Sequence, residues 1–233
     1  MTSAIILAGG LGTRLRGAVP NLPKPMAPVK GRPFLEHLMN YWIAQGIEHF
    51  VISVGYRHEQ IIQYFGDSYH TAKIEYSIEE TPLGTGGGLL LARNKLNAQK
   101  PFLLLNGDTY FKVSLIRLIA FASHHNADWS FCLFRTNEKD RYTPLSLEPD
   151  GKISSFSSCK GVNGRLANGG VYWVTPKGLD LQIARQIPVS LENDIFPLAL
   201  QTGKKLMGIE FDEPFIDIGV PSDYFRAGTL LVD

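Results

Sequence analysis

The stretch Ile5-Ile6-Leu7-Ala8-Gly9-Gly10-Leu11-Gly12-Thr13-Arg14-Leu15-Arg16 decides how this chain folds. Its apolar beginning predicts a buried first strand, and the glycines that follow predict a tight turn because they neither extend a strand nor start a helix. The turn exposes backbone N–H groups, and two arginines and Lys24, between two prolines, add positive charge. Such a site suits a polyphosphate, so we interpret it as a nucleoside triphosphate site. The glycines by themselves are also compatible with a plain strand-to-helix connection.

Two other phosphate-binding motifs do not fit the sequence. The dinucleotide fingerprint needs a third glycine, which Gly10-Leu11-Gly12-Thr13-Arg14-Leu15 lacks, and no acidic residue ends a second strand at the expected distance. A P-loop needs Gly-Lys followed by Ser or Thr, and the chain contains no such triplet. The predicted triphosphate site is therefore of a different kind.

The composition limits the class of protein. With 233 residues, of which 44% are hydrophobic, the chain is long enough to bury a large core. Its 23 Lys and Arg residues nearly balance 22 Asp and Glu residues, so we expect no nucleic-acid partner and no membrane-surface binding. We find neither a secretory signal nor an apolar run long enough to span a membrane, and expect a cytoplasmic protein with Cys132 and Cys159 reduced.

The first half of the chain alternates between strand and helix patterns. This pattern is typical of an α/β fold with a parallel sheet, in which ligands bind at the carboxyl ends of the strands. We therefore expect the glycine turn, a second glycine run and Asp108 to meet at one edge. The expected strands are 5–8, 50–54, 74–78 and 102–105, and the expected helices are 34–43, 58–65, 89–96 and 115–124.

The second half has a different pattern. Between Tyr142 and Val174, turn-forming residues separate short strands, which predicts a small antiparallel subregion that covers the cleft. Because no linker is visible, we expect a single domain over 1–233, with a nucleotide-binding half at roughly 1–112 and a sugar-binding half at roughly 113–233. Further expected elements are a strand over 129–134, a helix near 191–201, a strand near 206–210 and a last helix from Pro221.

Two aspartates are candidates for a metal site. Asp108 follows a buried strand and Asn-Gly, and Asp217 ends a short apolar strand before a glycine. Mg²⁺ in proteins takes one or two carboxylates and completes its shell with phosphate oxygens and water. A pair of strand-end aspartates fits this requirement, although an aspartate at such a position is also a common helix cap or turn former.

Taken together, these motifs resemble those of the sugar-1-phosphate nucleotidylyltransferases. The resemblance covers nearly the whole chain and rests on the glycine stretch, Pro23-Lys24-Pro25, Leu83-Gly84-Thr85-Gly86-Gly87, Asn106-Gly107-Asp108 and Asp217-Ile218-Gly219. It implies a Rossmann-like, mostly parallel sheet with helices on both faces, the nucleotidyltransferase fold similar to GT-A, plus the antiparallel sugar-binding subregion. It also implies an enzyme that uses Mg²⁺.

The resemblance assigns roles residue by residue. Arg14, Lys24 and Asp108 would be catalytic, and Asp108 and Asp217 would share the metal. Lys160 departs from the family pattern, because Phe156-Ser157-Ser158-Cys159-Lys160 lacks the usual acid and places the lysine one position late; a solvated surface lysine is the alternative. The nucleotide would contact Leu7, Ala8, Gly9, Gly10, Gly12, Thr13, Glu79, Glu80, Pro82, Gly84, Thr85 and Gly107, and the sugar phosphate would contact Lys160, Asn168, Gly169 and Glu192.

A narrower resemblance rests on Lys24-Pro25-Met26-Ala27-Pro28, Ser53-Val54-Gly55-Tyr56, residues 79–88 and Asn106-Gly107-Asp108-Thr109. Within the family, these segments resemble guanylyltransferases that act on D-glycero-α-D-manno-heptose 1-phosphate. The implied partners are GTP and a sugar 1-phosphate, for the synthesis of surface polysaccharide precursors, and a homo-oligomer is left open. We expect Glu79, with Glu80 as the neighbouring alternative, to read guanine, since an ionised carboxylate accepts hydrogen bonds from adjacent N–H groups. Other hypotheses are a uridylyltransferase or an enzyme for mannose or N-acetylmuramate 1-phosphate, a non-catalytic regulatory subunit, and a glycosyltransferase.

Overall fold

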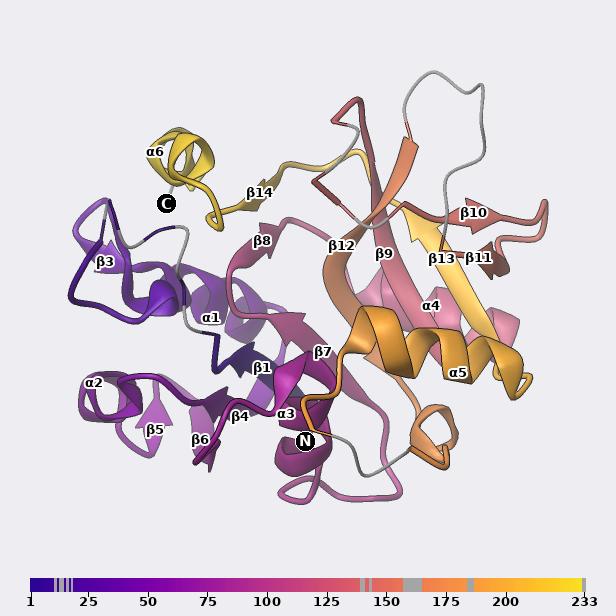
Figure 1. Ribbon diagram of the computed structural model, residues 1–233, viewed down its shortest axis with the longest axis horizontal. Helices are drawn as coiled ribbons and strands as arrows, with labels where there is room; N and C mark the ends of the chain where they lie inside the picture. The colour runs from indigo at the N-terminus through magenta and orange to yellow at the C-terminus, as the bar shows by residue number, and fades with distance from the viewer. Residues whose placement is uncertain are drawn as a thin grey trace.

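A computed structural model describes residues 1–10, 12, 15, 17, 19–138, 141–142, 144–156, 165–183 and 187–231. Its centre is an eight-stranded sheet in the order β13-β9-β12-β7-β1-β4-β6-β5 (Figure 1). The sheet takes strands from both halves of the chain. They are β1 (Thr2–Ala8), β4 (Ile47–Val54), β5 (Ser68–Tyr69), β6 (Ala72–Ile78), β7 (Phe102–Asn106), β9 (Trp129–Thr136), β12 (Arg165–Val174) and β13 (Leu206–Glu210).

Five α-helices cover the two faces of this sheet. They are α1 (Phe34–Ala44), α2 (His58–Phe65), α3 (Gly84–Arg93), α4 (Leu115–His125) and α5 (Phe196–Gln201). Neighbouring residues of β1 point to opposite faces: Ile6 packs in the apolar cluster that includes α1, α2 and α4, and Ile5 packs in the cluster that includes α3 and α5. The expected α/β fold with helices on both faces is confirmed.

The parallel part of the sheet is the part that the alternating pattern predicts. β1 pairs in parallel with β4 on one side and with β7 on the other, and β4 pairs in parallel with β6. All residues of β4 except Glu48 are buried, as are four of the five residues of β7. Because these strands have helices on both sides, they are continuously apolar and do not alternate.

The second half joins the same sheet. β12 is a ten-residue strand that runs antiparallel to both β7 and β9, and β13 continues the sheet in parallel with β9. The expectation of only short strands between Tyr142 and Val174 is therefore wrong for this strand. Its register shifts between Asn168 and Tyr172, where Gly169 and Gly170 interrupt the pairing with β9.

Small antiparallel pairs accompany the sheet, and one of them, β10 (Ser146–Leu147) with β11 (Ile153–Ser155), lies in the range where the antiparallel subregion was expected. Another pair bears on the site, because β14 pairs with β8 and so brings Asp217 opposite Thr109, next to Asp108. The last helix, α6 (Pro221–Leu230), returns to the amino-terminal half, where Tyr224 donates a hydrogen bond to the carbonyl of Pro28 (Figure 1). The pairs are β2 (Pro28–Val29) with β3 (Arg32–Pro33), β8 (Thr109–Phe111) with β14 (Phe215–Asp217), and β10 (Ser146–Leu147) with β11 (Ile153–Ser155).

Two helices differ from their predictions. The second glycine run lies inside α3, which begins at Gly84 and ends at Arg93, because Gly86 and Gly88 pack against neighbouring side chains too closely for a Cβ. The helix expected near 191–201 is divided into a π-helical turn, η4 (Leu191–Ile195), and α5. Among the described residues, no helix is both long and apolar enough to cross a membrane. Cys132 is a free, buried thiol, and Cys159 lies outside the described residues.

Candidate active site

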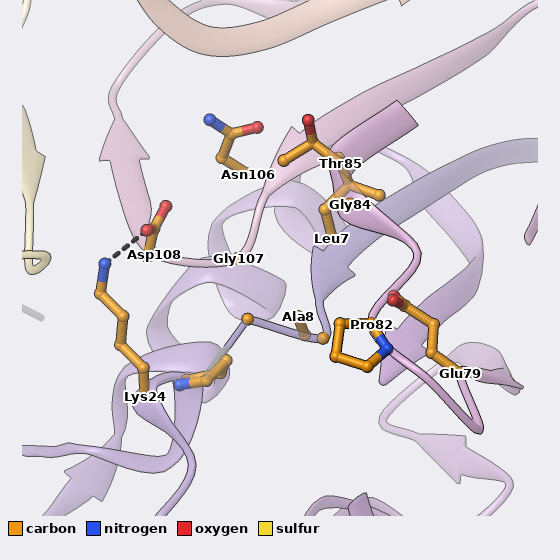
Figure 2. A pocket seen from close by; sticks show the side chains of 13 residues that line it. Leu7, Ala8, Lys24, Glu79, Pro82, Gly84, Thr85, Asn106, Gly107 and Asp108 are labelled. Atoms are coloured by element: carbon orange, nitrogen blue, oxygen red, sulfur yellow. Dashed lines mark hydrogen bonds and ion pairs between the residues drawn. The ribbon is translucent and has the colours of Figure 1, made fainter. Parts of the chain in front are cut away.

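A pocket of about 260 Å³ opens at the carboxyl ends of β1 and β7. Figure 2 shows Lys24 and Asp108 at one end of this pocket and Glu79 with Pro82 at the other. The pocket therefore has one end suited to phosphate and metal and another with a hydrogen-bond acceptor. Its lining residues are Leu7, Ala8, Gly9, Gly10, Lys24, Pro25, Glu79, Pro82, Gly84, Thr85, Asn106, Gly107 and Asp108.

The floor of the pocket is backbone. Gly9 and Gly10 follow the last residue of β1, and the N–H of Gly107 donates a 2.9 Å hydrogen bond to the carbonyl of Leu7. This bond joins the loop that follows β7 to the carboxyl end of β1. A Cβ on Gly9 would collide with the carboxylate of Glu79, so the close approach of that side chain requires glycine here.

Glu79 is fixed within the fold. Its Oε1 accepts a 2.9 Å hydrogen bond from the hydroxyl of Ser53, and its Oε2 accepts a 3.1 Å bond from the N–H of Leu83. Ser53 is fully buried, while Glu79 is half-buried and lines the pocket. Each carboxylate oxygen has a second lone-pair direction, so Glu79 keeps acceptor capacity toward the pocket. Glu80, the alternative reader, is exposed and lines no part of this pocket.

Lys24 connects the two candidate metal ligands. It begins the short 3-10 helix η2 (Lys24–Met26), and its Nζ donates to Oδ2 of Asp108 and lies 3.8 Å from Oδ1 of Asp217. Only 11% of the Lys24 side chain is exposed, so this contact between charges is largely removed from water. The three groups come from three separate segments, and one ammonium brings the two carboxylates toward a common point.

Asp217 is the more buried of the two aspartates. Burial raises the pKa of its carboxyl, the charge of Asp108 raises it further, and Lys24, the Gly219 N–H and Arg141 oppose these effects. Gly219 donates a 2.6 Å hydrogen bond to Oδ1, and a Cβ at this position would lie 2.8 Å from Nζ of Lys24. Two carboxylates that repel each other and face one cation fit a hard divalent ion such as Mg²⁺. No cluster of three or more metal-ligating side chains occurs among the described residues, so the remaining ligands would be phosphate oxygens and water.

Among the predicted sugar-phosphate residues that the structure describes, Glu192 and the Asn168-Gly169-Gly170 segment connect to residues of the pocket lining. Glu192 accepts a 3.1 Å hydrogen bond from the hydroxyl of Thr85, which lines the pocket. Asn168 donates a 2.6 Å bond to the Tyr172 hydroxyl, and its Oδ1 accepts from the N–H of Gly170 at 3.1 Å. The glycine pair after Asn168 packs against Asn106, because a Cβ on Gly170 would lie 2.8 Å from its Nδ2. The interruption in β12 thus packs against Asn106, which lines the pocket.

The structure brings most of the predicted residues together. Asp217 joins the pocket through Lys24, and Gly12 lies against the side chain of Lys24. Thr13, Arg14 and Lys160 lie outside the described residues, so their roles stay predictions. Pro25 and Asn106 are lining residues that the sequence motifs contained but to which we assigned no role. The predicted residues in the lining are Leu7, Ala8, Gly9, Gly10, Lys24, Glu79, Pro82, Gly84, Thr85, Gly107 and Asp108.

Comparison with known proteins identifies the family. The chain matches the nucleotidyl transferase family over residues 3–233. It belongs to that family. The assignment confirms the resemblance found in the sequence motifs and favours a nucleotidyltransferase over a glycosyltransferase.

Individual relatives of this nucleotidyl transferase are similar over nearly their full length. The chain is 39% identical over 225 residues to D-glycero-alpha-D-manno-heptose 1-phosphate guanylyltransferase of Aneurinibacillus thermoaerophilus, covering 96% of each chain. It is 38% identical to the protein of the same name from Campylobacter jejuni, covering 96% of this chain and 97% of the relative. HddC from Yersinia pseudotuberculosis complexed with GMP-PN has 31% identity and a TM-score of 0.81, over 98% of this chain and 99% of HddC.

Proposed function

We propose that this nucleotidyl transferase transfers GMP from GTP to D-glycero-α-D-manno-heptose 1-phosphate and releases pyrophosphate. The observation that carries the proposal is the 39% identity, over 96% of both chains, to an enzyme named for this activity. The pocket supports it, because Gly9 and Gly10 line it, with Lys24 at one end and Glu79 at the other (Figure 2). We further propose that the reaction takes place in the cytoplasm and that its product serves surface polysaccharide synthesis.

The proposed reaction is an in-line displacement without a protein nucleophile. A phosphate oxygen of the sugar 1-phosphate attacks the α-phosphorus of GTP, a new P–O bond forms, and the bond to the β-phosphate breaks with its electrons going to pyrophosphate. Because both reactants are anions, catalysis depends on positioning them and on stabilising the charge that moves to the leaving oxygens.

The chain supplies groups for both tasks. The N–H groups of the Gly9-Gly10 turn would bind phosphate oxygens, and the ammonium of Lys24, at the pocket wall, would stabilise the transferred and leaving phosphates. Asp108 and Asp217 would hold Mg²⁺, which supplies Lewis-acid stabilisation of the phosphate charge when bound. Arg14 would add a second cation.

A matrix of nucleoside triphosphates against sugar 1-phosphates, followed by pyrophosphate release, tests the proposal. We expect the largest kcat/KM for GTP with the heptose 1-phosphate. Mannose 1-phosphate, N-acetylmuramate 1-phosphate and UTP serve as the comparison substrates. A larger kcat/KM with UTP, or with a different sugar, would replace the proposed substrates, and no pyrophosphate release with any pair would support a regulatory subunit instead.

Lys24 is expected to act mainly on the transition state, because negative charge moves onto pyrophosphate as it leaves. Lys24→Ala should therefore lower kcat by at least about tenfold and by a larger factor than it raises the KM for GTP. Arg14→Ala is likewise expected to lower kcat by a larger factor than it raises the KM for GTP. Steady-state kinetics measure both constants.

Lys100→Ala is the matched control for Lys24→Ala. Lys100 is exposed and precedes β7 at its amino end, away from the pocket, so this variant should keep both constants. A change in KM alone for Lys24→Ala would make Lys24 a ground-state ligand and contradict the prediction.

A further inference from the structure

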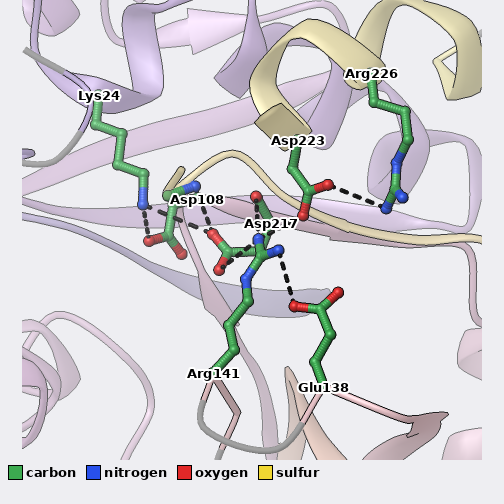
Figure 3. Close-up of polar contacts among 8 residues, drawn as sticks. Lys24, Asp108, Glu138, Arg141, Asp217, Asp223 and Arg226 are labelled. Atoms are coloured by element: carbon green, nitrogen blue, oxygen red, sulfur yellow. Dashed lines mark hydrogen bonds and ion pairs between the residues drawn. The ribbon is translucent and has the colours of Figure 1, made fainter. Parts of the chain in front are cut away.

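The guanidinium of Arg141 is the centre of a charge network that is partly shielded from water. Its Nη2 donates a 3.1 Å hydrogen bond to the backbone carbonyl of Asp217, lies 3.5 Å from Oδ2 of the same residue and forms an ion pair with Asp223. Its Nη1 lies 3.3 Å from Oε2 of Glu138. Figure 3 shows these carboxylates arranged around the Arg141 guanidinium. Arg141 does not line the pocket and was not predicted as a site residue.

Arg141 connects three segments that are far apart in the sequence. It lies in the segment that follows β9, Asp217 ends β14, and Asp223 lies in the first turn of α6. The side chains of Arg141 and Asp217 are each 15% exposed, and that of Asp223 is 8% exposed. Ion pairs that are shielded from water and made by a planar, multidentate guanidinium restrict geometry far more than exposed pairs do.

These contacts restrict the orientation of the Asp217 carboxylate. Its Oδ2 is the oxygen next to Arg141, whereas its Oδ1 accepts from Gly219 and lies 3.8 Å from Lys24. Each oxygen thus has its own cation, and rotation of the carboxylate would break both sets of contacts. The backbone bond from Arg141 additionally fixes the position of Asp217 at the end of β14.

We propose that Arg141 is a positioning residue that holds the Asp217 carboxylate in the orientation needed to share a divalent cation with Asp108. The inference rests on the proposed function, since it assumes that these aspartates bind the metal. Lysine is not equivalent to Arg141 in this role, because its ammonium stands one bond short of Nη2, the atom that contacts Asp223, the Asp217 carboxylate and the Asp217 carbonyl. It also lacks a second terminal nitrogen for Glu138. Residues that orient metal ligands typically affect metal affinity by about 10- to 100-fold when mutated.

Arg226 provides a matched control. It forms an ion pair with Oδ1 of Asp223 at 3.2 Å, but it is 57% exposed, and in the part of the chain that the structure describes the arginine beside Asp217 is Arg141. Arg226→Ala therefore removes an arginine from the same network without removing the group that orients the candidate ligand.

The experiment measures Mn²⁺ binding to the full chain by electron paramagnetic resonance, without substrates. We expect Arg141→Lys to raise the Kd for Mn²⁺ by about tenfold or more. The same variant should raise the Mg²⁺ concentration that gives half-maximal pyrophosphate release, and excess Mg²⁺ should restore part of kcat. Arg226→Ala should stay within about twofold of the wild type in both measurements, as expected for an exposed pair. Circular dichroism and thermal unfolding verify that each variant is folded.

Asp217→Asn, measured in parallel, distinguishes a failure of the role proposed for Arg141 from a failure of the proposed metal site. If Asp217→Asn loses Mn²⁺ affinity and a folded Arg141→Lys does not, the role of Arg141 is overturned and the proposed metal site stands. If Asp217→Asn itself binds Mn²⁺ like the wild type, the metal role of Asp217 is wrong. If Arg141→Lys fails to fold, Asp223→Asn tests the inference instead. This variant weakens the ion pair that holds Arg141 and leaves Asp217 unchanged, so an unchanged Kd for Mn²⁺ would overturn the inference.

Discussion

Replacing Asp108 or Asp217 with Asn is expected to lower kcat by about 100-fold or more, because a metal ion supplies several kcal/mol of charge stabilisation in phosphoryl transfer. The two carboxylates meet at the ammonium of Lys24, and asparagine preserves their size while removing the charge that attracts a divalent ion. Each variant should remain folded, because the amide oxygen of asparagine can still accept the hydrogen bond from Lys24 at position 108 and from the Gly219 N–H at position 217. Pyrophosphate release and thermal unfolding measure the two properties.

Asp212→Asn is the control for this prediction. Asp212 is exposed and lies between β13 and β14, so its replacement should leave kcat unchanged. Removal of divalent cations with a chelator should abolish the activity of the wild type, and added Mg²⁺ should restore it. Near-normal turnover in Asp108→Asn or Asp217→Asn, or full activity with chelator, would rule out the shared metal site.

The parallel half of the fold was predictable because its strands are continuous apolar runs. Ile5 and Ile6 pack against different helix layers, and such two-sided burial gives the sequence a signal that does not depend on distant residues. The residues that end helices were also predictable from the local sequence. Gly66 ends α2 with a positive φ of 63°, as the sequence pattern indicated.

β12 was harder to predict because its pairing depends on contacts that are remote in the sequence. Asn168-Gly169-Gly170 is typical of a turn, yet the strand continues through these residues with a shift in register. The reason is tertiary: a Cβ on Gly169 would lie 2.5 Å from the ring of Phe111, and one on Gly170 would lie 2.8 Å from Asn106. The glycines permit close packing here instead of ending the strand.

The site residues could likewise be predicted where the signal is local in the sequence, and could not where it depends on remote contacts. Lys24, Asp108 and Glu79 were found because each stands in a motif at the end of an element, where a parallel sheet gathers its ligands. Arg141 was missed, since it lies in a polar segment with alternating charges that has no helical or strand period, and its partner Asp217 is 76 residues away. The contacts of Arg141 with two aspartates become visible only when the chain is folded.

Glu79 is expected to make the enzyme select GTP over UTP and dTTP by about three orders of magnitude or more in kcat/KM. Guanine presents N1–H and N2–H₂ side by side, which match the two oxygens of a carboxylate, whereas uracil and thymine present one N–H flanked by carbonyl oxygens that repel it. Ser53 and Leu83 hold one oxygen each, so the carboxylate cannot turn away to accommodate the wrong base. Sites built to hydrogen-bond a particular polar group of the substrate discriminate by such factors against a substrate that lacks it.

Glu79→Gln should narrow this preference by about tenfold or more, mainly through weaker use of GTP, because the amide offers one acceptor and places N–H donors against those of guanine. Glu80→Gln is the matched control, since Glu80 is exposed and outside the pocket lining. Ser53→Ala should shift the preference in the same direction by a smaller factor, because Ser53 only fixes the carboxylate. Equal kcat/KM for GTP and UTP in the wild type would refute guanine selection. If Glu80→Gln narrowed the preference and Glu79→Gln did not, the reader would be Glu80, and the anchored carboxylate of Glu79 would serve to hold the Gly9 turn in place.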